Sequence, residues 1–359
     1  MSVLHGPDEL TPAWLTTVLR GSGALADDGA AVASFAVTPI GTGQMGDSFR
    51  VGLTYDGDAG AAPATVVIKF AAQDETSRNT GQALRSYEVE MRFYREVAAR
   101  SALQVPRCHL AAIEDDGSWF TLVLGDLAPA SQGDQIAGLS EAQVRACAVA
   151  LAGLHGPCWE ADDLAGLEWL NRVTPETAEF TALLISTLYP GFIERYGDQL
   201  SSEDREVCDR FIERLSPYLG DLSGPRTVVH GDYRADNLLF TDGGSDVTAV
   251  DWQTVAWGRG PGDVAYLVGL SFADRAERAA VEESIVREYH AALEGFGVQD
   301  YPWEACWRHY RLGAFTTLIM SIAPSMLVER TERGDEMFMT SLRRGASQIR
   351  DLGALALLP

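Results

Sequence analysis

The sequence predicts a two-part α+β fold, with a β-rich N-terminal part and a mainly helical C-terminal part. Apolar residues alternate with others in Phe49–Tyr55 and run without interruption in Val66–Phe70, and both patterns are typical of strands. Later in the chain, apolar residues recur at helical spacing instead. At 359 residues the chain is long enough for two hydrophobic cores. We expect the parts to be 1–124 and 125–359, because turn-forming residues gather just after Leu124.

The N-terminal part is expected to hold strands and one long helix. Besides the two strands above, Val32–Ile40 has strand composition, and Leu110–Ile113 with Trp119–Leu124 predicts a hairpin around the turn EDDG. The helix is predicted over Asn79–Arg100. Its apolar face would be formed by Leu84, Tyr87, Met91, Tyr94 and Ala98.

In the C-terminal part, the clearest helix signal is Ser140 with Gln143, a capping box that predicts a helix start. The segment Val228–Val250 is expected to form short strands on either side of a loop. We interpret Leu312–Val328 as a buried helix, kinked or ended at Pro324. Further helices are predicted at 175–196, 203–219, 263–272, 275–294, 303–328 and 335–351.

Composition excludes several classes of function. A net charge of −23 argues against nucleic-acid binding, because phosphate backbones require basic patches. No apolar run reaches the roughly 20 residues that a membrane span needs, and the first residues lack the pattern of a signal peptide. The five cysteines are scattered without a CxxC pair, which favours reduced thiols and a cytoplasmic protein. The oligomeric state cannot be predicted.

The most informative segment is HGDYRADNLLF, His230–Phe240, followed by AVDWQ. It brings Asp232, Asn237 and Asp251 close together in sequence. The spacing suits a phosphoryl-transfer site: Asp232 would orient an acceptor hydroxyl, while Asn237 and Asp251 would bind Mg²⁺ through hard oxygen ligands. Arg234 either reaches the γ-phosphate or lies on the surface. His230 is expected to hold the loop through hydrogen bonds, and Asp263 to have a structural role.

A lysine early in the chain supports the same chemistry. Lys69 is the only lysine among the 28 basic residues and ends the apolar run TVVIKF, where an ammonium can reach nucleotide phosphates. It needs an anionic partner on the following helix. Glu88 and Glu90 lie on opposite sides of the apolar face, each about 80° from its centre at ~100° per residue. Helical geometry alone does not decide between them.

The glycine-rich segment GTGQMG contains Gly41, Gly43 and Gly46. A strand pattern rather than a helix follows it, which favours a β-loop-β flap over phosphates and disfavours a dinucleotide-binding turn. Glycines let backbone N–H groups approach phosphate oxygens, and Ser48 could add a hydroxyl contact. An ordinary tight hairpin is the alternative. No GxxxxGK[ST] motif occurs.

These motifs resemble those of the aminoglycoside phosphotransferase and choline kinase superfamily, which has a protein-kinase-like fold of two lobes. HGDYRADNLLF with DWQTVAWGRGPGDVAYL is most similar to its ecdysteroid-kinase-like and acyl-CoA-dehydrogenase-associated kinase branch. The similarity spans roughly residues 35–345. It implies that Asp232 is the catalytic aspartate, that Asn237 and Asp251 bind metal, and that Lys69 binds phosphate.

The resemblance has further implications. Glu90 stands four residues before Tyr94, as the branch's helix glutamate does, so the resemblance favours Glu90 over Glu88. It also implies a hinge at about 122–128 that receives adenine through backbone groups, Val123 and Leu124 among them. Gly125 stands where relatives often carry an acidic residue, so ATP and GTP both remain open.

The sequence therefore predicts a small-molecule kinase that uses ATP, or GTP, with Mg²⁺ to phosphorylate a hydroxyl group. A catalytically silent nucleotide-binding protein of the same fold is the alternative, and a GxGxxG dehydrogenase is a weaker one. The acceptor stays open among aminoglycosides, amino-alcohols, sugars, hydroxy-acyl compounds and steroids.

Overall fold

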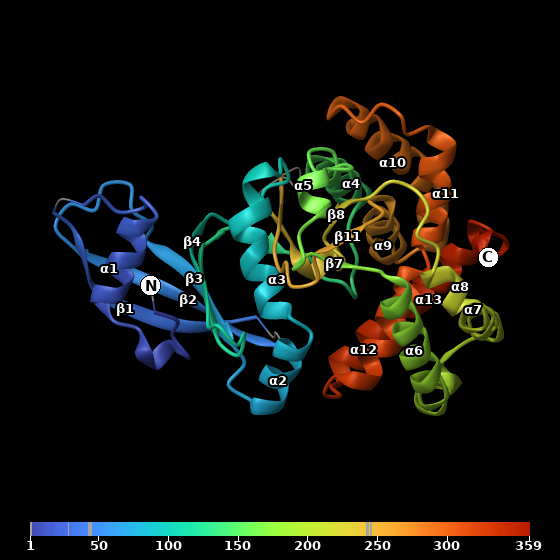
Figure 1. Cartoon of the computed structure of the whole chain (residues 1–359), viewed down its shortest axis with the longest axis horizontal. Helices are drawn as coiled ribbons and strands as arrows, with labels where there is room; N and C mark the ends of the chain where they lie inside the picture. Colours follow the sequence, from blue (N-terminus) through green and yellow to red (C-terminus); the bar gives the residue numbers. More distant parts are fainter. Residues whose placement is uncertain (1, 28, 42–44, 242–243, 245) are drawn as a thin grey trace. The chain divides into compact units, whose positions relative to one another are not determined.

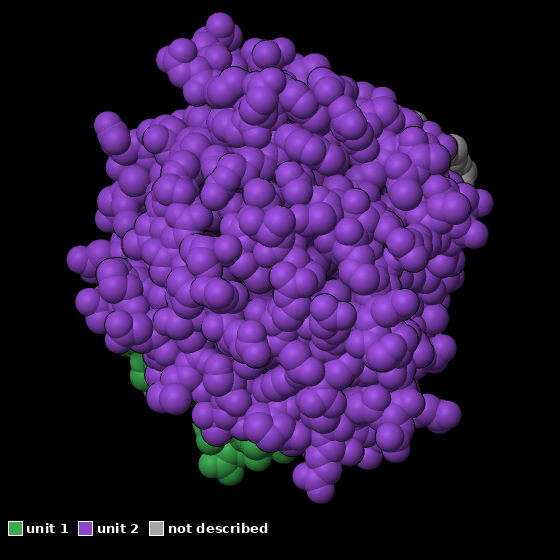
Figure 2. Space-filling model, turned by 90° about the vertical axis from the view of Figure 1, so that its right-hand side faces the viewer, with its two compact units in different colours: residues 1–99, 105–129, 250–255 green, residues 100–104, 130–249, 256–359 purple. Residues whose placement is uncertain are grey.

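The structure, a computed structural model, describes residues 2–27, 29–41, 45–241, 244 and 246–359. The chain divides into two compact units, coloured separately in Figure 2. Unit 1 comprises residues 1–99, 105–129 and 250–255, and unit 2 comprises residues 100–104, 130–249 and 256–359. The predicted parts were continuous in sequence, whereas the units are not, because 250–255 clusters with the N-terminal residues.

Unit 1 is built on one antiparallel sheet of order β1-β2-β3-β5-β4 (Figure 1). Helix α1 (Pro12–Gly21) packs on β1, and its Leu15, Val18 and Leu19 are buried in the unit's core. The predicted strands and hairpin are confirmed. The strands are β1 (Ala31–Ile40), β2 (Gly46–Asp56), β3 (Thr65–Ala71), β4 (Cys108–Ile113) and β5 (Phe120–Gly125).

The single helix predicted over Asn79–Arg100 is wrong. The chain forms α2 (Glu75–Ala83) and α3 (Ser86–Arg92), and α3 continues into a π-helical turn and a short 3₁₀ turn that end at Arg100. Between α2 and α3, Arg85 adopts a left-handed conformation with φ +58°, which ends α2.

A tertiary contact explains this break. The Tyr87 hydroxyl donates to the Met45 carbonyl at 2.6 Å, so the ring is drawn across the end of α2. Gly81 makes room for it, since a Cβ there would lie 2.6 Å from the Tyr87 ring. Leu84, predicted on the buried face, is instead 56% exposed.

Unit 2 is mainly helical, with two small three-stranded sheets of order β10-β9-β6 and β7-β11-β8. The short strands predicted within Val228–Val250 are confirmed as β8 (Thr227–Val229), β9 (Leu238–Phe240) and β10 (Val247–Ala249). The remaining strands are β6 (Ser131–Gln132), β7 (Asn171–Arg172) and β11 (Ala256–Gly258). The helices are α4 (Glu141–His155), α5 (Asp162–Ala165), α6 (Pro175–Tyr196), α7 (Ser202–Glu213), α8 (Leu215–Leu219), α9 (Pro261–Ser271), α10 (Arg275–Gly295), α11 (Trp303–Gly313), α12 (Thr316–Leu327) and α13 (Glu332–Asp351).

The capping box at the start of α4 is confirmed: Ser140 accepts from the Gln143 backbone, and the Gln143 side chain accepts from the Ser140 backbone. The predicted helix over 303–328 is two helices, α11 and α12. A Cβ at Gly313, where α11 ends, would lie 2.7 Å from the Gly262 Cα of α9, so the close crossing of two helices depends on glycine there. Pro324 does not end α12, which continues to Leu327.

None of the helices in the described parts of the chain is long and apolar enough to cross a membrane. All five cysteines are described, and no disulfide joins any of them.

Candidate active site

The loop that carries Asp232 runs from β8 to β9 in unit 2. Its backbone is held by Asp263, in the first turn of α9, whose carboxylate accepts from His230 N at 2.6 Å and from Gly231 N at 3.1 Å. His230 in turn accepts from Asp232 N through Nδ1 at 3.3 Å, so it holds the loop as expected. The sequence suggested a structural role for Asp263 but did not connect it to this loop.

The carboxylate of Asp232 receives hydrogen bonds on both oxygens. Asn237 donates from Nδ2 to Oδ2 at 2.8 Å and to the Asp232 carbonyl at 2.9 Å, which joins the two ends of the segment 232–237. On Oδ1, the Tyr266 hydroxyl donates at 3.1 Å. Sequence analysis did not find Tyr266, because it lies 34 residues away on α9 and no local motif links it to Asp232.

Arg234 forms ion pairs with two carboxylates of the same loop. Its Nε lies 3.2 Å from both oxygens of Asp232, and its Nη1 donates to Asp236. Burial opposes the charge of the guanidinium, but the attraction of Asp232 and its neighbours outweighs it and raises the pKa of Arg234. The side chain is 19% exposed, so the surface role left open by the sequence does not describe it.

In unit 1, Lys69 lies on β3 and forms two ion pairs. Its Nζ donates to both oxygens of Glu90 at 2.7 Å and to Asp251 Oδ1 at 3.0 Å. Glu90 is therefore the partner on α3, while Glu88 pairs with Arg85 and Arg92. Burial works to lower the pKa of Lys69, but Asp251 and Glu90 together raise it, so the ammonium stays charged.

Asp251 is held in an unusual backbone conformation with φ +67°. Such a conformation persists in a residue other than glycine only where its surroundings fix it, and it occurs often at functional sites. The next residue, Trp252, is fully buried and stacks on Phe93 with ring centroids 3.8 Å apart. The Trp252 backbone N–H also donates to Glu90 at 3.4 Å, so the segment that carries Asp251 is anchored to α3.

The glycine-rich segment joins β1 and β2. Gly41 has φ +74°, a conformation that favours glycine. Gly46 pairs with Ala71 of β3, and a Cβ there would lie 2.9 Å from the Phe70 carbonyl. Ser48 lies opposite Lys69 across the β2–β3 ladder. Gly43 lies outside the described residues.

The predicted hinge residues Val123 and Leu124 lie within β5, the strand between β3 and β4. Directly after β5, Asp126 accepts from Arg50 Nε at 2.7 Å and from Nη2 at 3.1 Å. This bidentate pair ties the end of β5 to β2. Burial opposes the charge of Asp126, but the bonds from Arg50 and the Ala128 backbone lower its pKa.

The donor atoms of the predicted metal ligands suit Mg²⁺. Asn237 uses its amide nitrogen toward Asp232, which leaves its amide oxygen as the atom of the right chemistry for a hard cation. Asp251 contributes a carboxylate. Asn237 belongs to unit 2 and Asp251 to unit 1. Across the described residues, no group of three or more His, Cys, Asp or Glu side chains could hold a metal ion.

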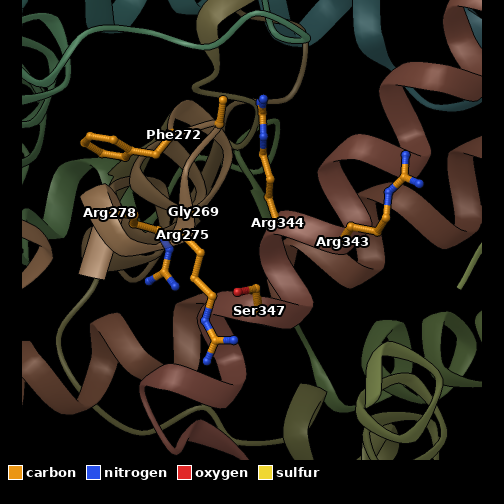
Figure 3. A pocket seen from close by; sticks show the side chains of 8 residues that line it. Gly269, Phe272, Arg275, Arg278, Arg343, Arg344 and Ser347 are labelled. Atoms are coloured by element: carbon orange, nitrogen blue, oxygen red, sulfur yellow. The ribbon is translucent and has the colours of Figure 1, made fainter. Parts of the chain in front are cut away.

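A separate hollow of about 190 Å³ lies in unit 2 among α9, α10 and α13, and four arginines line it (Figure 3). Arg275 and Arg278 both donate to Asp351. Arg344 donates to three backbone carbonyls, and in Figure 3 Arg343 and Arg344 point away from the other two. Because the guanidinium groups diverge and three of them already have partners, we interpret this hollow as structural.

Comparison with known proteins identifies the family. Residues 37–305 match the sequence profile of the phosphotransferase enzyme family. This chain belongs to that family. No curated protein sequence matched it.

Solved structures share its fold along nearly the whole chain. A protein of Ralstonia eutropha JMP134 classed as an aminoglycoside phosphotransferase has a TM-score of 0.59 at 16% identity, over 97% of this chain and 99% of its own. Choline kinase from Cryptosporidium parvum Iowa II has a TM-score of 0.56 at 13% identity, over 90% of this chain and 92% of its own. The GDP complex of an aminoglycoside 2'-phosphotransferase-IIIa mutant has a TM-score of 0.52 at 13% identity, over 96% of this chain and 98% of its own. These likenesses confirm the predicted α+β, kinase-like two-lobed fold.

Proposed function

We propose that this chain is a small-molecule kinase that transfers the γ-phosphoryl group of ATP to a hydroxyl group, with Mg²⁺ as cofactor. The observation that carries the proposal is the bonding of Asp232, whose carboxylate is fixed by Asn237, Arg234 and Tyr266 in a loop pinned to α9. Membership of a family of phosphotransferases agrees with it.

Residues of unit 1 would bind the nucleotide. Lys69 carries a charged ammonium oriented by Glu90, which suits the oxygens of the α- and β-phosphates. Gly41 and Gly43, which follow β1 in sequence, and Gly46 and Ser48, at the start of β2, would cover the phosphates. Backbone groups at the end of β5, from Val123 and Leu124 onward, would receive the base. ATP is the proposed donor and GTP the alternative.

Two oxygen ligands, Asn237 and Asp251, would hold Mg²⁺, which when bound supplies positive charge against the phosphate oxygens. Asp251 is at present paired with Lys69. Binding of a metal and a polyphosphate would give each of these two groups a new partner of opposite charge, so the arrangement suits Mg·ATP.

The Asp232 carboxylate would accept a hydrogen bond from the acceptor hydroxyl and aim its oxygen at the γ-phosphorus. In phosphoryl transfer, positioning and electrostatic stabilisation supply most of the rate. Arg234, held between Asp232 and Asp236, would keep positive charge beside the reacting groups. The unpaired cysteines support a reducing compartment, so we propose the cytoplasm as the site of action.

Two measurements together test the proposal. Thermal-shift titration with Mg·ATP and Mg·GTP should raise the melting temperature for the preferred nucleotide, because a ligand that binds the folded state stabilises it. A screen of amino-alcohols, sugars, aminoglycosides, hydroxy-acyl compounds and steroids should then find an acceptor that increases ADP or GDP release. Stabilisation by a nucleotide without turnover on any acceptor would instead favour a silent nucleotide-binding protein.

A further inference from the structure

Tyr266 is a buried tyrosine whose hydroxyl is directed at the Asp232 carboxylate. It lies within α9, is 5% exposed, and donates to Asp232 Oδ1 at 3.1 Å. A buried phenol needs a hydrogen-bond partner, and this carboxylate oxygen supplies one. The contact joins α9 to the loop that carries Asp232.

The same helix also fixes the backbone of that loop. Asp263 stands three residues before Tyr266, so both side chains leave neighbouring turns of one helix face. Asp263 binds the backbone N–H groups of His230 and Gly231, and Tyr266 binds the carboxylate two residues after His230. Helix α9 therefore sets both the position of the loop and the orientation of its carboxylate.

Donors from two directions define the plane of the carboxylate. Tyr266 donates to Oδ1, and Asn237 donates to Oδ2 at 2.8 Å. The Nε of Arg234 lies 3.2 Å from both oxygens. Rotation of the carboxylate about its Cβ–Cγ bond would break the bonds from Tyr266 and Asn237 together.

The Tyr266 hydroxyl remains a donor over the working range of pH. Burial, together with the negative charge of Asp232, raises the pKa of Tyr266 well above its ordinary value. The phenol therefore stays protonated and keeps its hydrogen to donate. Asn237 and Arg234 belong to the loop itself, so Tyr266 is the donor that ties the carboxylate to a separate helix.

We propose that Tyr266 is a positioning residue for phosphoryl transfer: its hydroxyl fixes the plane of the Asp232 carboxylate, which then meets the acceptor hydroxyl at the productive angle. The inference rests on the proposed function, in which Asp232 orients that hydroxyl. Small errors in such an orientation are costly, up to about 100-fold in rate for about 1 Å.

The test is a double-mutant cycle with an acceptor found by the screen. Tyr266→Phe keeps the buried ring and removes only the hydroxyl. It should lower kcat about 5- to 20-fold and leave KM for both substrates within about twofold, because the lost bond affects orientation rather than binding. In an Asp232→Ala background, which has no acceptor for the Tyr266 hydroxyl, the same change should alter the residual kcat by less than about twofold.

Tyr189→Phe is the matched control. Tyr189 is also a buried tyrosine of unit 2 whose hydroxyl donates to an aspartate, Asp209, at 2.7 Å. Loss of the Tyr189 hydroxyl should leave kcat unchanged. The variant therefore shows what removal of a buried phenol hydroxyl does at a position away from Asp232. The melting temperatures of both variants should be measured beside the kinetics.

The outcomes are distinct. If the wild type turns over an acceptor and Tyr266→Phe has the same kcat, this inference is overturned. The proposed function then remains intact. Equal losses from Tyr266→Phe in the wild-type and Asp232→Ala backgrounds also overturn it, because Tyr266 would then act independently of the Asp232 carboxylate. Absence of turnover in the wild type with every acceptor removes the proposed function and this inference with it.

Discussion

Lys69 places its ammonium 2.7 Å from both carboxylate oxygens of Glu90, a residue 21 positions further along the chain. The pair joins β3 to α3 and is largely buried, with the side chain of Glu90 3% exposed and that of Lys69 16% exposed. Burial is the largest influence on Glu90 and raises its pKa, while Lys69 opposes that shift. An ion pair in such surroundings has a defined geometry, which suits a lysine that must meet phosphate oxygens.

Glu90→Gln should weaken binding of Mg·ATP about 10- to 100-fold. The amide is isosteric but neutral, so it no longer orients the Lys69 ammonium by a charged hydrogen bond, a contact of about 1.5–3 kcal/mol. Isothermal titration calorimetry measures the change. Glu88→Gln is the control, because Glu88 pairs with Arg85 and Arg92 instead, and its Kd should stay within about twofold. Equal effects of the two substitutions would contradict the assignment.

Asn237→Ala should raise the half-saturating Mg²⁺ concentration at least about 10-fold, because it removes one of the two proposed oxygen ligands. It should also lower kcat, since Asn237 donates to Asp232. Turnover measured against Mg²⁺ concentration separates the two effects. An unchanged Mg²⁺ dependence beside a reduced kcat would mean that Asn237 acts only through Asp232. Asn79→Ala, on the exposed part of α2, serves as the control and should change neither quantity.

The sequence predicts the elements with strong local signals and fails where a tertiary contact decides. Alternating apolar residues predict β2, and an uninterrupted apolar run predicts β3. Ser140 with Gln143 marks the start of α4. Each of these signals lies within a few residues. By contrast, the break between α2 and α3 depends on the contact of Tyr87 with Met45, far away in sequence. No periodicity records a contact of that kind.

For the candidate site, the motif around Asp232 brings the proposed reacting groups together within a short stretch of sequence. Helical spacing could not decide between Glu88 and Glu90, since both lie at equal angles from the apolar face. The packing of α3 against the sheet makes that choice, by bringing Glu90 to Lys69. Tyr266 has no sequence signal at all, because its role depends on how α9 packs beside the loop.

Stability at acidic pH should depend on His309, which is buried and bonded to the Tyr301 hydroxyl at 2.8 Å. Burial, with help from Arg259 and Arg308, lowers the pKa of His309 to about 4. Because the folded-state pKa lies below the ordinary value of about 6.5, the unfolded chain binds the proton first. The folded state therefore loses stability as pH falls from about 6.5 towards 4.

Urea denaturation at pH 7.5 and pH 5 measures this effect. The loss of unfolding free energy between the two pH values should be smaller in His309→Asn than in the wild type, by on the order of 1 kcal/mol. The comparison at pH 7.5 gives the cost of the substitution itself. Identical acid sensitivity in both proteins would exclude His309 as a source of the pH dependence.

The measurement that most directly tests the account is transfer of the labelled γ-phosphoryl group from ATP to the acceptor identified by the screen, in the wild type and in Asp232→Asn. The account predicts a phosphorylated acceptor from the wild type and a kcat about 10²- to 10⁴-fold lower in the variant, with binding of Mg·ATP retained. Undiminished transfer by Asp232→Asn would contradict it.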